Sequence, residues 1–212
     1  MKVYAEYRNN NLRKKTLLQF GESIELIGSA VLMNPGSAEP KEECFDINII
    51  HEFYKKLKLD INIIKNDWKI FYSDDGMKQV EKIFNGYYIK NEIIRLNGII
   101  QLFNCFYYMN ADRNIAKKEF SILSDKPEYI FDESKMFSNK PVYFGWGVEG
   151  LKGKYRNIAE KIFNEYNCEY KNIYEPDFDK NEFYHPAYIN KYYRKNEGVK
   201  NILYKFYGLL YH

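Results

Sequence analysis

Four short segments of the chain hold the side chains best suited to chemistry. They are Asn34-Pro35-Gly36-Ser37, Asn104-Cys105, Gly145-Trp146-Gly147 and His185-Pro186-Ala187. An Asn amide is both a donor and an acceptor, so it can hold a water molecule or pair with the edge of a nucleobase. An imidazole held by a neighbouring Pro can donate a hydrogen bond to a developing anion. These residue types favour electrostatic catalysis and polar recognition.

Each segment also has an ordinary structural interpretation. Asn-Pro-Gly is a strong turn signal in any protein, because Pro fixes φ and Gly relieves steric limits. Asn104 can serve as a simple strand-end cap, and His185 can be a structural histidine at the surface. No one of the four segments therefore identifies a site when it is taken alone.

Metal and cofactor chemistry has no support in the sequence. The three histidines are His51, His185 and His212, and no His, Cys or carboxylate cluster has the spacing of metal ligands. The chain lacks a P-loop, a dinucleotide-binding GxGxxG and a GxSxG nucleophile elbow. The three cysteines stand about 60 residues apart, a spacing that fits neither a disulfide framework nor a zinc clip. We expect no metal, no cofactor and reduced thiols.

The elements that must position the four segments alternate between strands and helices. Strands are predicted at Ile24–Met33, Gly98–Phe103 and Val142–Phe144, with a weaker fourth at Glu169–Ile173. Helical periodicity covers residues 49–57, 77–88, 112–123 and 151–166, and a last helix begins near residue 189. Strands separated by helices predict a three-layer α/β fold with a central, mostly parallel four-stranded sheet. Because each segment follows a strand or the loop after one, all four should meet at one rim of the sheet.

Composition limits the class of protein. The chain has 212 residues, 45% of them hydrophobic and 18% aromatic, which excludes a disordered or collagen-like chain and predicts one domain over residues 1–212. No apolar run approaches 18 residues, and the N-terminus lacks the apolar core of a signal peptide. We expect a soluble, cytoplasmic, monomeric protein that contacts no membrane.

Positive charge gathers at both ends of the chain although the net charge is only +3. Residues 1–20 hold five basic residues against Glu6, and residues 184–212 hold five against Glu197. Basic, Tyr-rich ends are compatible with a surface that contacts phosphates and stacks on bases. A solvated face of a Lys- and Tyr-rich chain is the ordinary interpretation of the same pattern.

Taken in chain order, the four segments resemble motifs of the uracil-DNA glycosylase superfamily. The sequence Leu32-Met33-Asn34-Pro35-Gly36 is similar to the GMNPG motif of its single-strand-selective monofunctional branch, and Asn104 ends the second strand as the base-reading Asn of the family does. Gly145-Trp146-Gly147 and His185-Pro186-Ala187 resemble the LWG and HPS motifs. The chain also resembles small bacterial proteins with a related Asn-Pro-Ser motif, whose function the resemblance leaves open.

The resemblance implies a uracil-DNA glycosylase-like fold and hydrolysis of the N-glycosidic bond of a base flipped out of DNA. In that hypothesis Asn34 holds the attacking water and His185 stabilises the departing base. The base would stack on Phe45, pair with Asn104 and lie beside the small residues Gly36 and Ser37. DNA, single- or double-stranded, is the implied partner. The residues implied to contact it are Tyr188, Lys191, Arg194 and Lys195.

Departures from the family pattern keep other hypotheses open. Ala187 stands where the family has a Ser that touches phosphate, and Asn34 stands where the most active branch has a carboxylate. The fold could therefore persist as a nucleic-acid-binding or interaction module without chemistry, and a hydrolase of free nucleosides is a third class. Small residues after Pro35 would admit a 5-substituted pyrimidine, so both repair of uracil or damaged pyrimidines and defence against modified phage DNA are compatible with the sequence.

Overall fold

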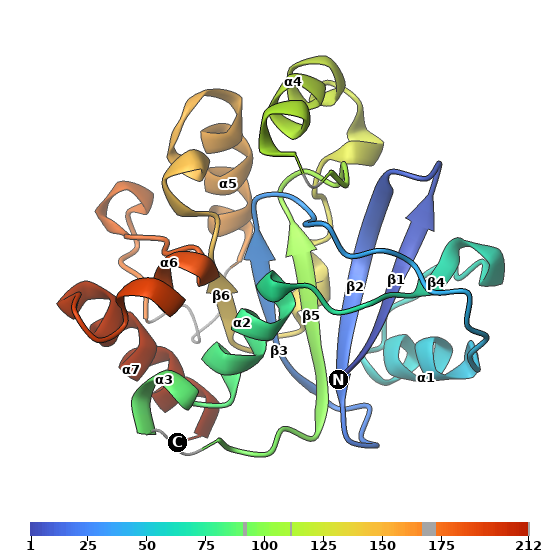
Figure 1. Ribbon diagram of the computed structural model, residues 1–212, viewed down its shortest axis with the longest axis horizontal. Helices are drawn as coiled ribbons and strands as arrows, with labels where there is room; N and C mark the ends of the chain where they lie inside the picture. The colour runs from blue at the N-terminus through green and yellow to red at the C-terminus, as the bar shows by residue number, and fades with distance from the viewer. Residues whose placement is uncertain (91–92, 111, 167–172, 212) are drawn as a thin grey trace.

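One six-stranded mixed sheet organises the protein (Figure 1). The computed structural model describes residues 1–90, 93–110, 112–166 and 173–211. From edge to edge the strands are β4 (Trp68–Ile70), β1 (Lys2–Arg8), β2 (Leu12–Phe20), β5 (Gly98–Asn104), β3 (Leu26–Leu32) and β6 (Val142–Phe144). The strands β5, β3 and β6 are parallel, whereas β2 pairs with β5, and β1 with β2 and β4, in the antiparallel sense.

The α/β class is confirmed, but the prediction of a mostly parallel four-stranded sheet is wrong. The strands predicted at Ile24–Met33, Gly98–Phe103 and Val142–Phe144 are present as β3, β5 and β6. Of the predicted strand Glu169–Ile173, residues 169–172 lie outside the described residues and Ile173 lies in a turn. The other half of the sheet is antiparallel and comes mainly from the N-terminal 20 residues.

The hairpin of β1 and β2 forms because its turn suits the residues in it. Asn9 and Asn10 lie in the loop between the paired residues Arg8 and Leu12, and they have φ values of 52° and 58°, in the left-handed region that Asn tolerates. Lys15 also has positive φ, at 45°, next to a register shift in the pairing of β1 with β2. The hairpin adds to the parallel strands through β2, where Thr16 pairs with Leu102.

Helices cover both faces of the sheet. On the face that we call the α2 face, the Phe84 ring of α2 (Asp75–Phe84) lies 5.0 Å from the Phe206 ring of α7 (Glu197–Tyr211). Phe206 in turn packs on Tyr143 of β6. On the opposite face, which we call the α5 face, Phe163 of α5 (Gly153–Glu165) packs on Phe144 of β6. The sheet is therefore the middle of three layers.

The predicted helices are present, with two of them divided. The described helices not yet placed are α1 (Asn48–Lys56), α3 (Tyr87–Lys90), α4 (Arg113–Leu123) and α6 (Pro186–Tyr192). The short 3-10 turns are Lys65–Asp67, Pro127–Tyr129, Ser134–Phe137, Gly147–Leu151 and Phe178–Lys180. Gly86, with φ of +76°, separates α2 from α3, and Asp112 caps α4 by accepting hydrogen bonds from the N–H groups of Asn114 and Ile115.

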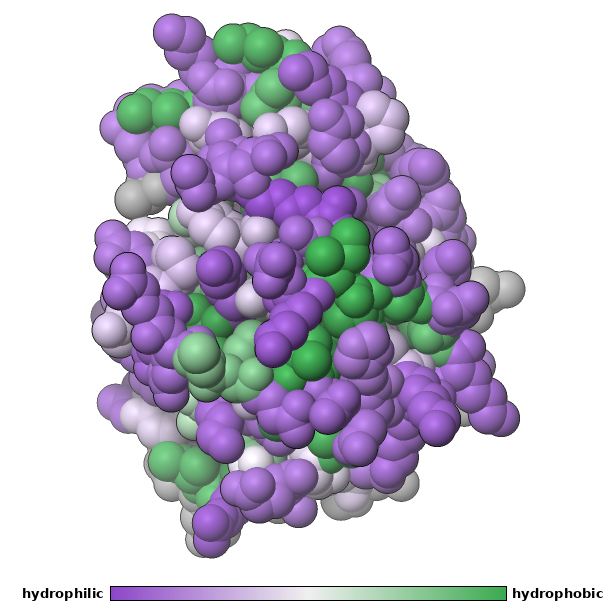
Figure 2. All heavy atoms as spheres, turned by 90° about the vertical axis from the view of Figure 1, so that its right-hand side faces the viewer, coloured by the Kyte–Doolittle hydropathy of each residue, from purple (hydrophilic) through white to green (hydrophobic). Residues whose placement is uncertain are grey.

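The outer surface over α1 and β4 is mostly hydrophilic, with a small apolar patch near its centre (Figure 2). Patches of this kind are normal on globular proteins. Among the described helices, none combines the length and the apolar composition that crossing a bilayer requires.

Candidate active site

The first three motif segments lie side by side at the carboxyl ends of the parallel strands. The amide N–H of Cys105 donates to the carbonyl of Leu32 at 2.9 Å, and Phe106 donates to Met33 at 3.0 Å. These bonds continue the β3–β5 ladder past the strand ends, so Asn34 and Asn104 leave neighbouring strands at the same rim. Gly145 donates to Val31 at 2.8 Å and brings the segment after β6 to the same place.

The His-Pro segment joins this rim through two glycines. A β-carbon on Gly145 would lie 2.9 Å from Leu32 Cδ2 and 3.2 Å from Pro186 Cδ. The glycine therefore allows the loop that carries Pro186 to pack closely against the end of β6. A β-carbon on Gly147 would lie 3.3 Å from the β-carbon of His185. The four segments, which are up to 150 residues apart in sequence, therefore meet at one end of the sheet.

The ring of His185 is oriented by the start of helix α6. His185 is the N-cap residue of α6, and its Nδ1 accepts the amide N–H of Ala187 at 3.2 Å. A ring nitrogen that accepts a hydrogen bond carries no proton, so the neutral imidazole bears its proton on Nε2. The side chain is half-buried. A neutral imidazole with its proton on Nε2 is a form that can stabilise an anion by donating a hydrogen bond.

A pocket of about 640 Å³ opens beside His185. Its aromatic wall comes from Trp146 and from three tyrosines spaced four residues apart. Tyr184 stacks on Tyr188 with ring centres 5.5 Å apart and planes 10° apart, and Tyr188 lies 4.4 Å from Tyr192. The other lining residues are Gly147, Val148, Leu151, Asn181, Glu182, Phe183, Ala187 and Lys191. Flat rings, one cation and an imidazole are groups that can hold a planar ring next to a phosphate.

Asn34 and Gly36 lie next to each other at the rim, on the loop after β3. The Asn34 side-chain amide donates to the Pro35 carbonyl at 3.0 Å, and the residue is half-buried. A β-carbon on Gly36 would lie 2.7 Å from the Oδ2 atom of Asp74, whereas Ser37 is exposed. The space beside Gly36 thus holds a carboxylate, which the sequence did not predict.

Asn104 ends β5 as expected and points to the α2 face. It is 1% exposed, and its Oδ1 has no hydrogen-bond partner among the described residues. A buried acceptor without a partner is rare in native proteins and marks a position where a ligand or a movement supplies one.

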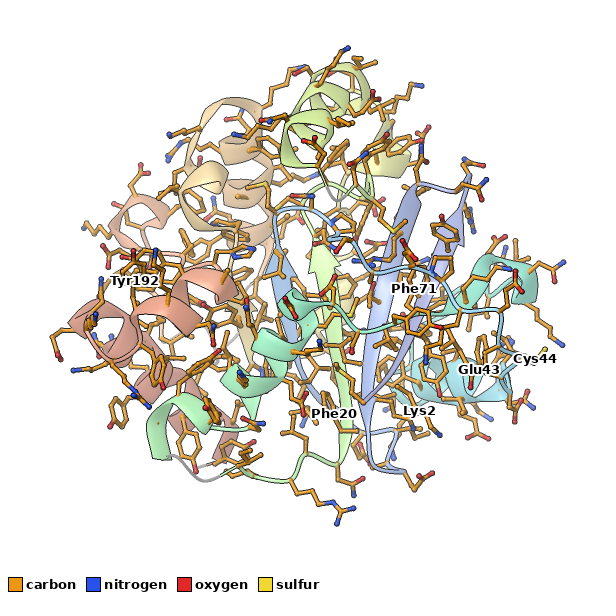
Figure 3. The ribbon with its side chains drawn as sticks, viewed as in Figure 1. Lys2, Phe20, Glu43, Cys44, Phe71 and Tyr192 are labelled. Carbon is orange, nitrogen blue, oxygen red and sulfur yellow. The ribbon has the colours of Figure 1, made fainter. Side chains whose placement is uncertain are left out.

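Phe45 lies on the opposite side of the sheet from Asn104. Its ring packs on Tyr4 of β1 at 5.1 Å, and Tyr4 donates to Gln19 of β2 on the α5 face. The neighbouring residues Glu43 and Cys44 lie beyond the β1 and β4 side of the sheet, whereas Tyr192 lies at the other side (Figure 3). The structure therefore does not bring Phe45 to the rim, because the chain after Ser37 runs along β4, where Lys41 donates to the carbonyl of Ile70.

Four of the five N-terminal basic residues, Arg8, Arg13, Lys14 and Lys15, contact acidic side chains within the fold. Arg13 is 1% exposed, with its guanidinium over the Phe71 ring. Burial lowers the pKa of Arg13 to about 10, although nearby Asp74 acts in the opposite direction, so it stays a cation at neutral pH. Lys15 pairs with Glu6 at 2.7 Å. Some of the N-terminal basic residues that were expected to contact phosphate are thus paired with acidic residues inside the protein.

The C-terminal basic residues divide between two sides of helix α6. Lys191 lines the pocket beside His185, with its Nζ 5.2 Å from the centre of the Tyr192 ring. Arg194 lies over Tyr193 and borders a different, smaller cavity with Lys200. Lys195 is exposed. Of the three residues, Lys191 alone lines the pocket within the described part of the chain.

Comparisons with known proteins assign no family. Protein-family models, curated proteins and solved structures were each compared with the chain, and no match was found. The geometry of the rim must therefore carry the functional argument.

Arg13, Thr16 and Asp74 are rim residues that sequence reasoning missed. Arg13 and Thr16 come from β2, which was not predicted as a strand, and Asp74 caps α2 by accepting the Met77 N–H at 2.9 Å. The Asn9-Asn10 turn was the signal that could have revealed β2. Within the described ranges, no group of three His, Cys, Asp or Glu side chains is arranged to hold a metal ion.

Proposed function

We propose that the protein is a monofunctional DNA glycosylase that hydrolyses the N-glycosidic bond of a flipped-out pyrimidine. One observation carries the proposal: four distant segments meet at the carboxyl ends of β3, β5 and β6, and the start of α6 orients the His185 ring at this rim through its Nδ1. A neutral donor at the mouth of an aromatic pocket suits a leaving group that departs as an anion. It suits neither metal hydrolysis nor nucleophilic catalysis.

The proposed reaction needs only groups of this chain, water and the nucleotide. The bond from the sugar C1′ to the base nitrogen breaks and its electron pair leaves with the base, while Nε2–H of His185 donates a hydrogen bond to the base oxygen on which charge gathers. Water then adds its oxygen to C1′ and gives up a proton that the base or solvent accepts. Asn34 orients that water once its amide turns from the Pro35 carbonyl. A preorganised donor of this kind contributes about 3–4 kcal/mol to catalysis.

Contacts with DNA are proposed for the pocket beside His185. The exposed Tyr188 ring, which stacks on Tyr184, provides a stacking surface for a base of the bound DNA strand. Each base stacked on an aromatic ring gains about 1–3 kcal/mol. Lys191 is placed to neutralise a phosphate there.

A second candidate function is a nucleic-acid-binding module that has lost the chemistry. It is favoured by the Asn34 amide, which is engaged with Pro35, and by the buried position of Asn104. Such a module would use the tyrosine-lined pocket for binding and would leave the glycosidic bond intact.

An abasic-site assay separates these functions and identifies the substrate. Single- and double-stranded oligonucleotides carrying uracil or 5-modified pyrimidines are incubated with the protein and then treated with hot alkali. Strand breaks from one substrate would establish a glycosylase, and faster cleavage of uracil than of 5-modified pyrimidines would exclude the defence role. Release of base from free nucleosides alone would point to a nucleoside hydrolase. DNA that is retarded in a gel-shift assay but shows no strand breaks would support the binding module.

A further inference from the structure

Several buried polar side-chain atoms have no hydrogen-bond partner among the described residues, and three of them belong to β2 and β5 on the α2 face: Arg13 Nε, Thr16 Oγ1 and Asn104 Oδ1. Their residues are between 0% and 1% exposed. Leaving one such group without a partner costs about 1–3 kcal/mol, and native interiors pair more than 90% of them. Three in one region of a fold call for a common explanation.

The three side chains lie on the same face of two adjacent strands. Thr16 of β2 is directly opposite Leu102 of β5, and opposed residues of antiparallel strands point to the same face. Asn104 follows Leu102 by two residues and so points to that face as well. This is the α2 face. Leu102 also pairs with Ala30, two residues from Gly28, and a β-carbon added to Gly28 would lie 3.0 Å from Cε1 of Phe84 in α2.

Arg13 reaches the same region from the rim end of β2. Its amide N–H donates to the carbonyl of Tyr107 at 3.1 Å, so β2 and the chain after Asn104 still run side by side there. Its guanidinium contacts Asp74, the cap residue of α2, and therefore also lies on the α2 face.

Residues 34–38, which we call the roof, cover Arg13; Pro35 and Ala38 within it are buried. The guanidinium Nη1 donates to the Ala38 carbonyl at 3.3 Å, and Nη2 lies 3.8 Å from Asp74 Oδ2. Charge-assisted hydrogen bonds of a buried guanidinium are ordinarily about 2.7–2.9 Å, so Arg13 retains donor capacity. The roof begins at Asn34, and Gly36 and Ser37 within it are exposed.

We propose that Arg13 and Thr16 join Asn104 in holding the flipped base when the roof at residues 34–38 lifts, and this inference rests on the proposed function. A guanidinium offers donors only, so it requires an acceptor on the ligand, such as the carbonyl oxygen of a base. Asn104 Oδ1 requires an N–H, and the Thr16 hydroxyl serves as donor or acceptor. Among pyrimidine bases, a ring edge with adjacent C=O and N–H groups is that of a pyrimidine-2,4-dione, whereas the ring nitrogen N3 of cytosine is an acceptor and cannot donate to Asn104. The site therefore takes uracil-type bases in preference to cytosine-type bases.

The test compares Thr16→Val, which removes the hydroxyl at nearly constant volume, with Thr16→Ser, which keeps it. Tyr54→Phe is the matched control, because the Tyr54 hydroxyl is equally buried and unpartnered among the described residues but faces the α5 side. We expect Thr16→Val to lower kcat/KM for uracil excision at least tenfold without loss of thermal stability, Thr16→Ser to restore most of the activity, and Tyr54→Phe to leave it unchanged.

Two results would overturn the inference while the proposed function stands: full activity of Thr16→Val in an active enzyme, or excision of cytosine-type bases in preference to uracil-type bases. If the wild type excises no base, the proposed function fails. The inference is then tested by measuring the binding of free uracil with isothermal titration calorimetry. Binding that Thr16→Val weakens at least tenfold supports the site. No binding by the wild type overturns it.

Discussion

Gly147 lies directly against His185. A β-carbon added to Gly147 would stand 3.3 Å from the His185 β-carbon, and Gly147 has φ of +68°. Both features favour glycine, because a left-handed φ is costly for most other residues and the contact is tighter than ordinary packing. The Gly-Trp-Gly segment thus sets the position of the imidazole from the adjacent strand end.

Gly147→Ala should lower both stability and activity. The left-handed backbone costs about 1–2 kcal/mol for a residue with a β-carbon, and the new methyl group displaces His185. Gly153→Ala is the control, since Gly153 also has positive φ, at 53°, but no heavy atom within 4 Å of its added β-carbon. Chemical denaturation should show a similar loss for both variants, whereas base excision should fall in Gly147→Ala alone. Equal activities would remove the proposed positioning role of Gly147.

His185 should have two separable roles. Asn is a good N-cap residue and Ala is a poor one, so His185→Ala should lose about 1 kcal/mol of stability through helix α6, and His185→Asn should lose less. Neither variant keeps the Nε2–H donor, so both should lower kcat by about 10²–10³-fold. Single-turnover kinetics and thermal melts of the two variants measure these effects. Retained activity in His185→Asn would assign the residue a capping role only.

Lys191 should contribute more to DNA binding than Arg194. Lys191 lines the pocket beside His185, whereas Arg194 lies on another side of the helix over Tyr193. Losing one phosphate contact reduces the dependence of log K on log salt by about 0.7–0.9. Fluorescence anisotropy over a range of salt concentrations should show this reduction for Lys191→Ala and none for Arg194→Ala. A larger reduction for Arg194→Ala than for Lys191→Ala would indicate that DNA binds on the other side of α6.

Cys105 should resist thiol reagents while Cys44 reacts. Cys44 is exposed, but Cys105 is fully buried directly after Asn104, and burial raises the pKa of its thiol well above the ordinary value. The thiolate is the reactive form, so in a Cys168→Ser background maleimide should label Cys44 at least 100-fold faster than Cys105. Mass spectrometry of peptides follows both sites. Rapid labelling of Cys105 would mean that the rim opens readily without a ligand.

The parallel half of the sheet could be predicted because its strands are apolar and end at recognisable residues. All seven residues of β5 are buried, and such runs are typical of parallel strands covered on both faces. The antiparallel half escaped prediction because β1 and β2 carry charged residues that the fold buries in pairs. Lys15 and Glu6 are an example, since neither indicates a buried strand until its partner is known.

The candidate site could be predicted only where chemistry follows strand ends. Asn34, Asn104 and His185 come together for that reason, through the parallel ladder and the two glycines. Phe45 was assigned by its offset along a loop, and a loop's path depends on tertiary contacts that the sequence does not encode locally. In this case the chain follows β4 to the other face of the sheet.

Release of a free base is the most direct test of the central claim. Oligonucleotides that carry one uracil or one 5-modified pyrimidine are incubated with the wild type and with His185→Asn, and the base and the DNA strand are both weighed by mass spectrometry. We expect the wild type to yield the free base and an intact strand with one abasic site, and His185→Asn to yield at most about a hundredth of either at the same time. DNA that is bound by the wild type and recovered with every base in place would contradict the account.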